Sequence, residues 1–573
     1  MIQILKKLKN KIFQFIKLSF NEKKYEFRSL GEINPGKSHI HIKNIFNQLR
    51  VDDEFMSNAL DNRYGFYGDK IYSFGEDSIN WFYDPISSFD YSLYDGKRIS
   101  ELFNKKIDIK VLWRLARLQH LPLIATRHPS DKNLNYILKT LNSFDSENKS
   151  YSGIHWSSGM EISIRAMNLY ATYILIYKNL SNEERLFISK LIYKHLFFLK
   201  NNIEYGSDRG NHYLINILVL DFLETEIFES KNIILNFLIK CELKYQFNKD
   251  GSHFEGSTNY TRLCYDAYLL NKLSHKTKST ITFSIPFSGI DFVHALIDIP
   301  RFFYKKYEEK RTFNFLLDNV SSSNEFIPIG DNDSGYIFTN KFIGNINQKK
   351  YFFDDIQVSK LIRNEVFNTN HIEQTNKLIR SKDFKNIRYR KFDDIVDKDI
   401  GEFNFSLPLS SRLKEYKDFG LFVLKSNDAY LSIKYNSSSR NSGHFHYDSL
   451  SMNLCFDGKF LLVDPGTETY TTSIKLRNYS RSGILHQSTS LLKNTKFFSS
   501  FKAKKTKVRR TKNSTKFIGH KDSIYKSIQI VRTTSSFDIK GTINRDNFKI
   551  WKELYPKHII FQTYGLRAYL DEI

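Results

Sequence analysis

The sequence is poor in cysteine and has no long apolar run. The three cysteines, Cys241, Cys264 and Cys455, show no paired spacing, which argues for buried thiols and against a disulfide framework or a thiolate metal site. No stretch approaches the roughly 20 apolar residues that a membrane-spanning helix needs. Lysines interrupt the amphipathic segment 1–20, so it lacks the apolar core of a signal peptide. We expect no transmembrane span; segment 1–20 is either a docking helix or a peripheral membrane contact.

Acidic residues are outnumbered by basic ones, with 86 Lys and Arg against 62 Asp and Glu and a net charge of +24. This excess favours a polyanionic partner such as nucleic acid, an acidic membrane surface or an acidic polysaccharide. A general compositional bias toward lysine would explain much of the excess without any partner. The basic run 502–510 has no recognisable nucleic-acid module beside it, so we expect no nucleic-acid partner.

The 573 residues are enough for two or three domains. Helical periodicity dominates from about 108 to 273, whereas short alternating runs separated by turns follow after about 402. The chain is therefore predicted to be an α+β multidomain protein, with a helical domain before an antiparallel β domain. The predicted helices are 111–121, 159–177, 182–198, 211–223, 233–247 and 260–273, and the predicted strands are 419–425, 429–435, 450–456, 460–464, 523–532 and 537–542.

Two histidines, His444 and His446, stand in a loop immediately before a predicted strand. From 449 to 456 apolar and polar residues alternate strictly, which is typical of a half-buried strand. Asp457-Gly458 is a strong hairpin signal, and the return strand ends near Asp464. Loops on rigid sheets often present reactive groups, so this segment is a candidate site.

His446, Asp464 and His486 offer two imidazoles and a carboxylate, a ligand set that suits zinc with a fourth position for water. Simple hairpin counting, however, places Asp464 opposite about Ser451. That position is roughly 16 Å along the strand from His446. Spacing alone therefore disfavours a metal site, unless the loop before the strand curls back.

Two polar segments open predicted helices. In Gly210-Asn211-His212, Asn211 is either an N-cap or part of a site. In the segment 250–260, Glu255 and Tyr260 belong either to a polar turn with a packed tyrosine or to a catalytic group.

Two further segments have simple structural interpretations. In the segment 156–165, Glu161 and Arg165 are four residues apart and can pair on one helical face. The acidic turn 330–335 resembles a calcium loop but lacks the glutamate that an EF-hand requires.

The order of these segments resembles the heparinase II/III family of polysaccharide lyases, which is similar to oligoalginate lyases of the same architecture. The resemblance covers about residues 110–490 and rests on Gly210-Asn211-His212, the 250–260 segment, Gly330-Asp331-Asn332-Asp333, His444-Phe445-His446-Tyr447-Asp448, Val463-Asp464-Pro465-Gly466 and the stretch from Arg481 to His486. The segment 156–165 looks like the N-terminal signature of that family.

The resemblance implies a lead segment over 1–100, an (α/α) toroid over 101–395 and an antiparallel β-sandwich over 396–573. It also implies β-elimination on an acidic polysaccharide that contains uronic acid. In that mechanism, Asn211 and His212 neutralise the uronate carboxylate, while Tyr260 and His444 act as the base and acid pair. His446, Asp464 and His486 would hold a structural Zn²⁺, and the residues assigned to substrate binding are Trp156, Arg165 and Glu255.

The family's residue types suit the reaction. Removing the C5 proton of a uronide requires a neutralised carboxylate beside it, which amide and imidazole donors supply. Arg114 stands where relatives carry an acidic residue, and the loop after His444 lacks a proline, so the identity of the sugar stays open. The resemblance implies a location in the cell envelope or periplasm, with a role in capsule or other cell-surface polysaccharide processing. The missing signal peptide makes the cytoplasm an alternative location, and a non-catalytic glycan-binding protein is the alternative function.

Overall fold

Helices dominate the first part of the protein, and strands dominate the last. The computed structural model describes residues 30–36, 38–49, 51, 53–67, 70–94, 107–127, 131–148, 151–205, 209–276, 280–282, 306–322, 326–331, 335–339, 356–369, 402–408, 410–435, 444–456, 459–462, 464, 466–467, 477–478, 480–483, 486, 506–521 and 524–542. The amphipathic segment 1–20, the hairpin turn 457–458 and most of the basic run before 506 lie outside these residues.

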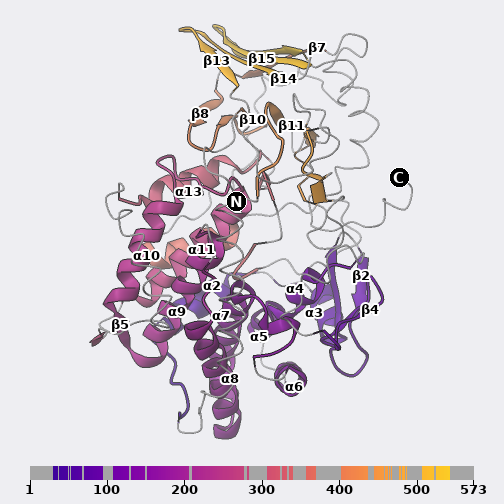
Figure 1. Ribbon diagram of the computed structural model, residues 1–573, viewed down its shortest axis with the longest axis vertical. Coiled ribbons are helices and arrows are strands. Elements are labelled where there is room, and N and C mark those ends of the chain that lie inside the picture. Colours follow the sequence, from indigo (N-terminus) through magenta and orange to yellow (C-terminus); the bar gives the residue numbers. More distant parts are fainter. Residues whose placement is uncertain are drawn as a thin grey trace, which may run out of the picture.

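The helical part places its long helices against one another, with α9 in contact with α7, α8, α10 and α11 (Figure 1). Its helices are α2 (His39–Asn47), α3 (Asp53–Leu60), α4 (Lys110–Ala116), α5 (His120–Thr126), α6 (Asp131–Glu147), α7 (Gly159–Ile176), α8 (Asn182–Asn201), α9 (Asn211–Phe228), α10 (Ile233–Gln246), α11 (Thr258–Ser274), α13 (Glu309–Asp318) and α14 (Gln357–Phe367). Short strand pairs accompany them: β1 (Arg63–Tyr67) with β2 (Lys70–Ser73), β3 (Tyr83–Asp84) with β4 (Phe89–Asp90), and β5 (Ser230–Asn232) with β6 (Thr280–Thr282).

Five of the six predicted helices are confirmed within a few residues, from α7 to α11. The sixth prediction, 111–121, is wrong because the segment divides into α4 and α5. Leu118 adopts a left-handed backbone conformation with φ of 56° between the two helices, which ends the first. None of the described helices is both long and apolar enough to cross a membrane.

The strands form two five-stranded antiparallel sheets. The inner sheet has the order β12-β11-β10-β9-β8, and the outer sheet has the order β13-β14-β15-β16-β7. In Figure 1 the inner sheet lies between the helices and the outer sheet. The strands are β7 (Glu402–Pro408), β8 (Arg412–Tyr416), β9 (Leu421–Lys425), β10 (Ala429–Lys434), β11 (Ser451–Phe456), β12 (Lys459–Leu462), β13 (Lys507–Arg510), β14 (Ser514–Lys521), β15 (Ile524–Arg532) and β16 (Ser536–Thr542).

The central strands β9, β10 and β11 of the inner sheet are buried on both faces, which corrects the prediction of a half-buried strand for β11. In β11, Met452 and Leu454 pack in a core shared with the outer sheet, as the alternation predicts. Cys455 points the other way, joins the helical core and lies 3.4 Å from the Ser322 hydroxyl. Small and polar residues can face the helices because partners there satisfy them.

Polar contacts also join the inner sheet to α13. The Tyr416 hydroxyl on β8 donates to Asp318 Oδ2 at 2.5 Å, and Arg412 pairs with the same carboxylate. The strand-rich part is therefore held against the helical part by both apolar packing and buried polar contacts. Of the predicted site residues, Tyr260, Glu255 and His444 meet at this junction.

Candidate functional site at the junction of helices and strands

Two glycines let three chain segments meet closely at the junction. Gly256 has φ of 75°, and a Cβ there would lie 1.8 Å from the Phe445 ring. Gly330 has φ of 77°, and its Cβ would lie 2.6 Å from the Gly256 carbonyl oxygen. Any side chain at either position would force these backbones apart. The glycines thus bring the turn before α11, the acidic turn and the two-histidine loop together.

The start of α11 is fixed to the acidic turn. The Ser257 hydroxyl caps the helix by accepting from the Tyr260 N–H at 3.2 Å and donates to the Asp331 carbonyl at 2.7 Å. This capping holds Tyr260 in the first turn, where its ring lies 4.4 Å from the His444 ring between centroids. Tyr260 is 2% exposed and His444 about a fifth, so the pair is largely shielded from water.

Glu255 connects Asn211 to this pair. Its carboxylate accepts from the Asn211 side chain at 2.6 Å and from the Asn211 backbone N–H at 3.1 Å. Two histidines also lie near Glu255 Oε2, His253 Nδ1 at 3.8 Å and His444 Nε2 at 3.9 Å. The N-cap interpretation of Asn211 is wrong, because Gly210 is the N-cap and Asn211 is the first residue of α9.

His212 lies beside a second carboxylate, that of the part-buried Glu204. His212 Nδ1 contacts Glu204, which also accepts from the Gly159 N–H at 2.9 Å and the Met160 N–H at 3.3 Å. Burial lowers the pKa of His212, but the Glu204 charge outweighs this effect and leaves the pKa raised. Glu204 lies in none of the sequence motifs and was therefore not predicted.

Trp156 and Arg165 lie apart from the other predicted site residues, inside the helical core. Both are at most 2% exposed. The Arg165 guanidinium donates to the His155 carbonyl at 2.7 Å and to His195 Nε2 at 2.9 Å. The Glu161 charge acts on Arg165, as the spacing predicted, but its direct bidentate pair is with Arg117 at 2.6 and 2.7 Å.

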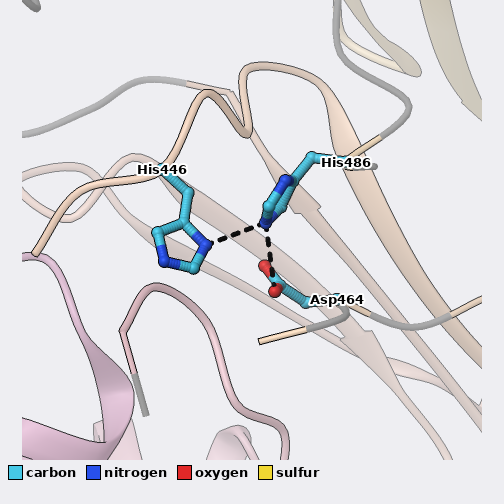
Figure 2. A group of neighbouring side chains, drawn as sticks. All are labelled: His446, Asp464 and His486. Atoms are coloured by element: carbon cyan, nitrogen blue, oxygen red, sulfur yellow. Dashed lines mark hydrogen bonds and ion pairs between the residues drawn. The ribbon is translucent and has the colours of Figure 1, made fainter. Parts of the chain in front are cut away.

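His446, Asp464 and His486 converge, as Figure 2 shows. One ligand atom from each lies within 4.8 Å of the others, although hairpin counting disfavoured this meeting. The segment before β11 does not continue the strand, because Leu450 has φ of 62° and the Tyr447 N–H donates to the Arg481 carbonyl at 2.9 Å. The loop therefore folds back over the sheet.

The donor atoms of this group suit a cation. The Asp331 carboxylate, 2.9 Å from His446 Nε2, and the Ser482 carbonyl, 2.8 Å from His486 Nδ1, can only accept, so an N–H at each of these nitrogens would satisfy them. The other two ring nitrogens, His446 Nδ1 and His486 Nε2, lie 2.8 Å apart and would then be available to a cation. Asp464 Oδ1 lies 3.3 Å from His486 Nε2, and its buried Oδ2 has no hydrogen-bond partner among the described residues. Such buried donors with outer hydrogen-bond partners are typical of a zinc site.

Asp331 was named in the sequence only within the acidic turn and the family motif that contains it, and it was given no role of its own. It is fully buried and contacts both histidines of the loop. Burial would raise its pKa, but Arg481 and the two histidines hold the pKa of Asp331 well below its usual range. Residues 332–334 of the same turn lie outside the described residues.

Comparison with known proteins agrees with this arrangement. Residues 408–545 match the family model described as Heparinase II/III-like, C-terminal. A crystal structure of heparinase III is 16% identical with a TM-score of 0.50, over 91% of this chain and 73% of that one. The heparan sulfate lyase HepC from Pedobacter heparinus, in a mutant form, is 15% identical with a TM-score of 0.40, over 86% of this chain and 71% of that one. No curated relative matches the chain.

Because the identities are low, the similarity to the solved structures supports only the fold. The family model covers the strand-rich part, which includes His444 and His446. The resemblance to the heparinase II/III family drawn from the sequence motifs is therefore confirmed, by a domain model over residues 408–545 and by the fold of heparinase III over most of the chain.

Proposed function

We propose that this protein is a polysaccharide lyase that cleaves an acidic, uronic-acid-containing polysaccharide by β-elimination. The observation that carries the proposal is the meeting of Tyr260 and His444 across the junction, with ring centroids 4.4 Å apart. A phenol and an imidazole in contact, both largely buried, form a suitable pair for proton removal and delivery. Heparinase III and a heparan sulfate lyase share similarity with the chain, which adds to this interpretation.

The elimination moves one proton off the sugar and one onto the leaving group. Tyr260 and His444 together remove the proton from C5 and deliver a proton to O4. The C5–H electron pair becomes the C4–C5 double bond, and the C4–O4 pair leaves with O4. The step balances without an oxidant or a reductant, so the reaction calls for no redox cofactor.

The carboxylate beside C5 must be neutralised for this proton to leave. Asn211 and His212 are the donors we assign to it, because His212 is part-exposed and its raised pKa favours the imidazolium. Glu255 orients Asn211 and faces His444. We therefore assign Glu255 a positioning role and no direct contact with the substrate. The burial of Trp156 and Arg165 likewise favours a structural role for both.

We assign a structural Zn²⁺ to His446, Asp464 and His486. When bound, the ion would supply a fixed positive charge that holds three ligands from separate segments together. Its protein ligands would then keep the loop that carries His444 folded back against the acidic turn. The donor geometry and the orphaned Asp464 oxygen support this assignment.

The proposal extends to the architecture and the setting. The packed helices would close as an (α/α) toroid within 101–395, after a lead segment 1–100, and the two sheets would form a β-sandwich within 396–573. The shared core between the sheets supports the sandwich. We place the reaction in the cell envelope, on cell-surface polysaccharide, with the cytoplasm as the alternative.

The test is the ultraviolet absorbance of the unsaturated uronate product. Zinc-loaded protein would be assayed on heparan sulfate, other glycosaminoglycans, alginate and the producer's own capsule. We expect absorbance to rise with time on at least one of them. No rise on any uronic-acid polymer, with folded and zinc-loaded protein, would contradict the lyase assignment. Tight binding of one polymer without product would favour the alternative, a non-catalytic glycan-binding protein.

A further inference from the structure

Asp331 touches both halves of the candidate site. Its side chain is completely buried at the junction, at the end of the segment 326–331. Among the described residues, its five side-chain partners all come from the strand-rich part: His444 Nδ1 at 2.9 Å, His446 Nε2 at 2.9 Å, Thr467 Oγ1 at 2.8 Å, Arg477 at 3.4 Å and Arg481 Nε at 3.7 Å.

The two oxygens of Asp331 serve different histidines. Oδ2 faces His444, which belongs to the acid and base pair, and Oδ1 faces His446, which belongs to the metal group. A carboxylate can only accept, so each ring must direct an N–H to it. Asp331 therefore determines which nitrogen of each ring remains available for another partner.

The nitrogens left over point to the two centres. In His444 the remaining nitrogen is Nε2, which lies on the side of Glu255. In His446 it is Nδ1, which faces His486 and the metal position. One carboxylate thus sets the proton position on both rings.

We propose that Asp331 is a positioning residue that couples occupancy of the metal site to the orientation of His444. This inference rests on the proposed lyase function and its metal site. A cation on His446 Nδ1 would fix the orientation of that ring, whose Nε2 lies 2.9 Å from Asp331 Oδ1. The carboxylate would then be held in place against His444 Nδ1, 2.9 Å from its Oδ2. Without the cation, the His446 ring loses the bond that fixes its orientation, and its hold on Asp331 weakens.

The substitution Asp331→Asn tests the coupling without changing the volume of the side chain. An asparagine offers one accepting oxygen and one donating amide, so it can receive an N–H from only one ring. The other ring must then turn or move its proton to the opposite nitrogen. We expect zinc affinity to fall by about 10- to 100-fold, as for other residues that orient metal ligands.

The matched control is Asp318→Asn. Asp318 is also a buried carboxylate at the junction, but its partners are Tyr416 and Arg412. This control reports the general effect of neutralising a buried junction carboxylate. We expect it to lower stability without changing zinc affinity or the His444 ring.

Three measurements are compared in the wild type, Asp331→Asn and Asp318→Asn. They are zinc affinity by competition with a chelator, the nitrogen NMR shifts of the His444 ring with and without zinc, and kcat and KM on a cleaved polymer. In the wild type, zinc removal should change the His444 shifts. In Asp331→Asn the shifts should be altered already and respond little to zinc, and kcat should fall more than KM rises.

Several results would overturn the coupling. The first is that the His444 NMR shifts of the wild type do not change when zinc is removed. The second is that the wild type does not bind zinc. The third is that Asp331→Asn binds zinc with unchanged affinity. If that variant does not fold, the wild-type shifts with and without zinc still decide the question. Affinity and shifts do not depend on turnover, so a failure of the lyase assignment would appear separately, as missing product from the wild type.

Discussion

The protein contains two buried polar clusters that look alike in composition and differ in what surrounds them. The arginine cluster lies among the helices and consists of Arg117, His155, Glu161, Arg165 and His195. The aspartate cluster lies at the junction and consists of Asp331, His444, His446, Thr467 and Arg481. Both combine imidazoles, guanidinium groups and carboxylates within the protein interior.

The difference is where each cluster directs its groups. In the arginine cluster, burial lowers the pKa of His155 to about 3, and Arg165 is enclosed by core residues. In the aspartate cluster, His444 keeps about a fifth of its side chain exposed and contacts Tyr260. The comparison separates a polar cluster enclosed within one part of the chain from one whose groups come from two parts and stay partly exposed at their junction, where we propose the reaction takes place. The predictions below test this contrast.

The largest effect is expected at the junction. Tyr260→Phe and His444→Gln remove the proton-transfer groups, so kcat should fall by about 10²- to 10⁴-fold. The melting temperature should change little, because neither substitution opens a large cavity. Steady-state kinetics and thermal unfolding check both statements.

The control for the tyrosine is Tyr265→Phe, on the same helix. Its hydroxyl contacts Glu309 and not His444. Full activity in Tyr260→Phe, or a fall in kcat of the same size in Tyr265→Phe, would contradict the difference we propose between the junction and the helical core.

The reverse behaviour is expected in the arginine cluster. Arg165→Met leaves the Ala116 and His155 carbonyls and His195 without their donor. Each unmet buried group costs roughly 1 to 3 kcal/mol, so the free energy of unfolding should fall by about 3 kcal/mol. Denaturant unfolding measures this loss, while kcat of the folded protein should stay within about twofold. A large fall in kcat with unchanged stability would place Arg165 in the site after all.

A smaller, pH-dependent effect is expected from Glu204→Gln. Glu204 raises the pKa of His212, so the imidazolium persists to higher pH in the wild type than it would without that charge. Removing the charge should move loss of the imidazolium to lower pH and reduce kcat/KM on the alkaline side by about 10-fold. The two proteins should converge only at a pH below the lowered His212 pKa of the variant, where both hold the imidazolium.

The measurement for Glu204→Gln is the pH profile of kcat/KM. Glu224→Gln is the matched control, because Glu224 is a buried glutamate that pairs with Lys200 away from His212. An unchanged profile in Glu204→Gln would mean that His212 does not act as a cation.

The smallest effect is expected from Asp266→Asn in the helical core. Burial raises the pKa of Asp266 to about 7, so the folded protein holds a proton that the unfolded chain has released. Wild-type stability from this group is therefore present at low pH and lost as pH rises toward 7. Between about pH 5 and pH 6, the variant should gain roughly 1 kcal/mol relative to the wild type. Parallel pH dependences of unfolding in the two proteins would contradict this account.

The local features of the fold were predictable, and the junction was not. The periodicity of α7 to α11 and the alternation in β11 follow from neighbours in sequence, and so does the cap before Tyr260. The turn at Leu450 was not foreseen, because a leucine with positive φ gives no local signal. The contact of Asp331 with His444 spans 113 residues, and only folding brings such partners together.

The convergence of His446, Asp464 and His486 also could not be predicted from local sequence spacing. Counting along a hairpin separated His446 from Asp464, while the family resemblance joined them, and the structure gathers both with His486. The resemblance carried three-dimensional information that spacing did not hold. The assignment of Trp156 and Arg165 to substrate binding came from the same resemblance, yet both lie in the core.

The masses of the reaction products test the central claim most directly. A defined uronic-acid oligosaccharide would be incubated with the zinc-loaded protein and its products weighed by mass spectrometry. Elimination predicts two products whose masses sum to that of the substrate, with the unsaturated ring on one of them. Products that together contain one added water would show hydrolysis and contradict the mechanism built on Tyr260 and His444.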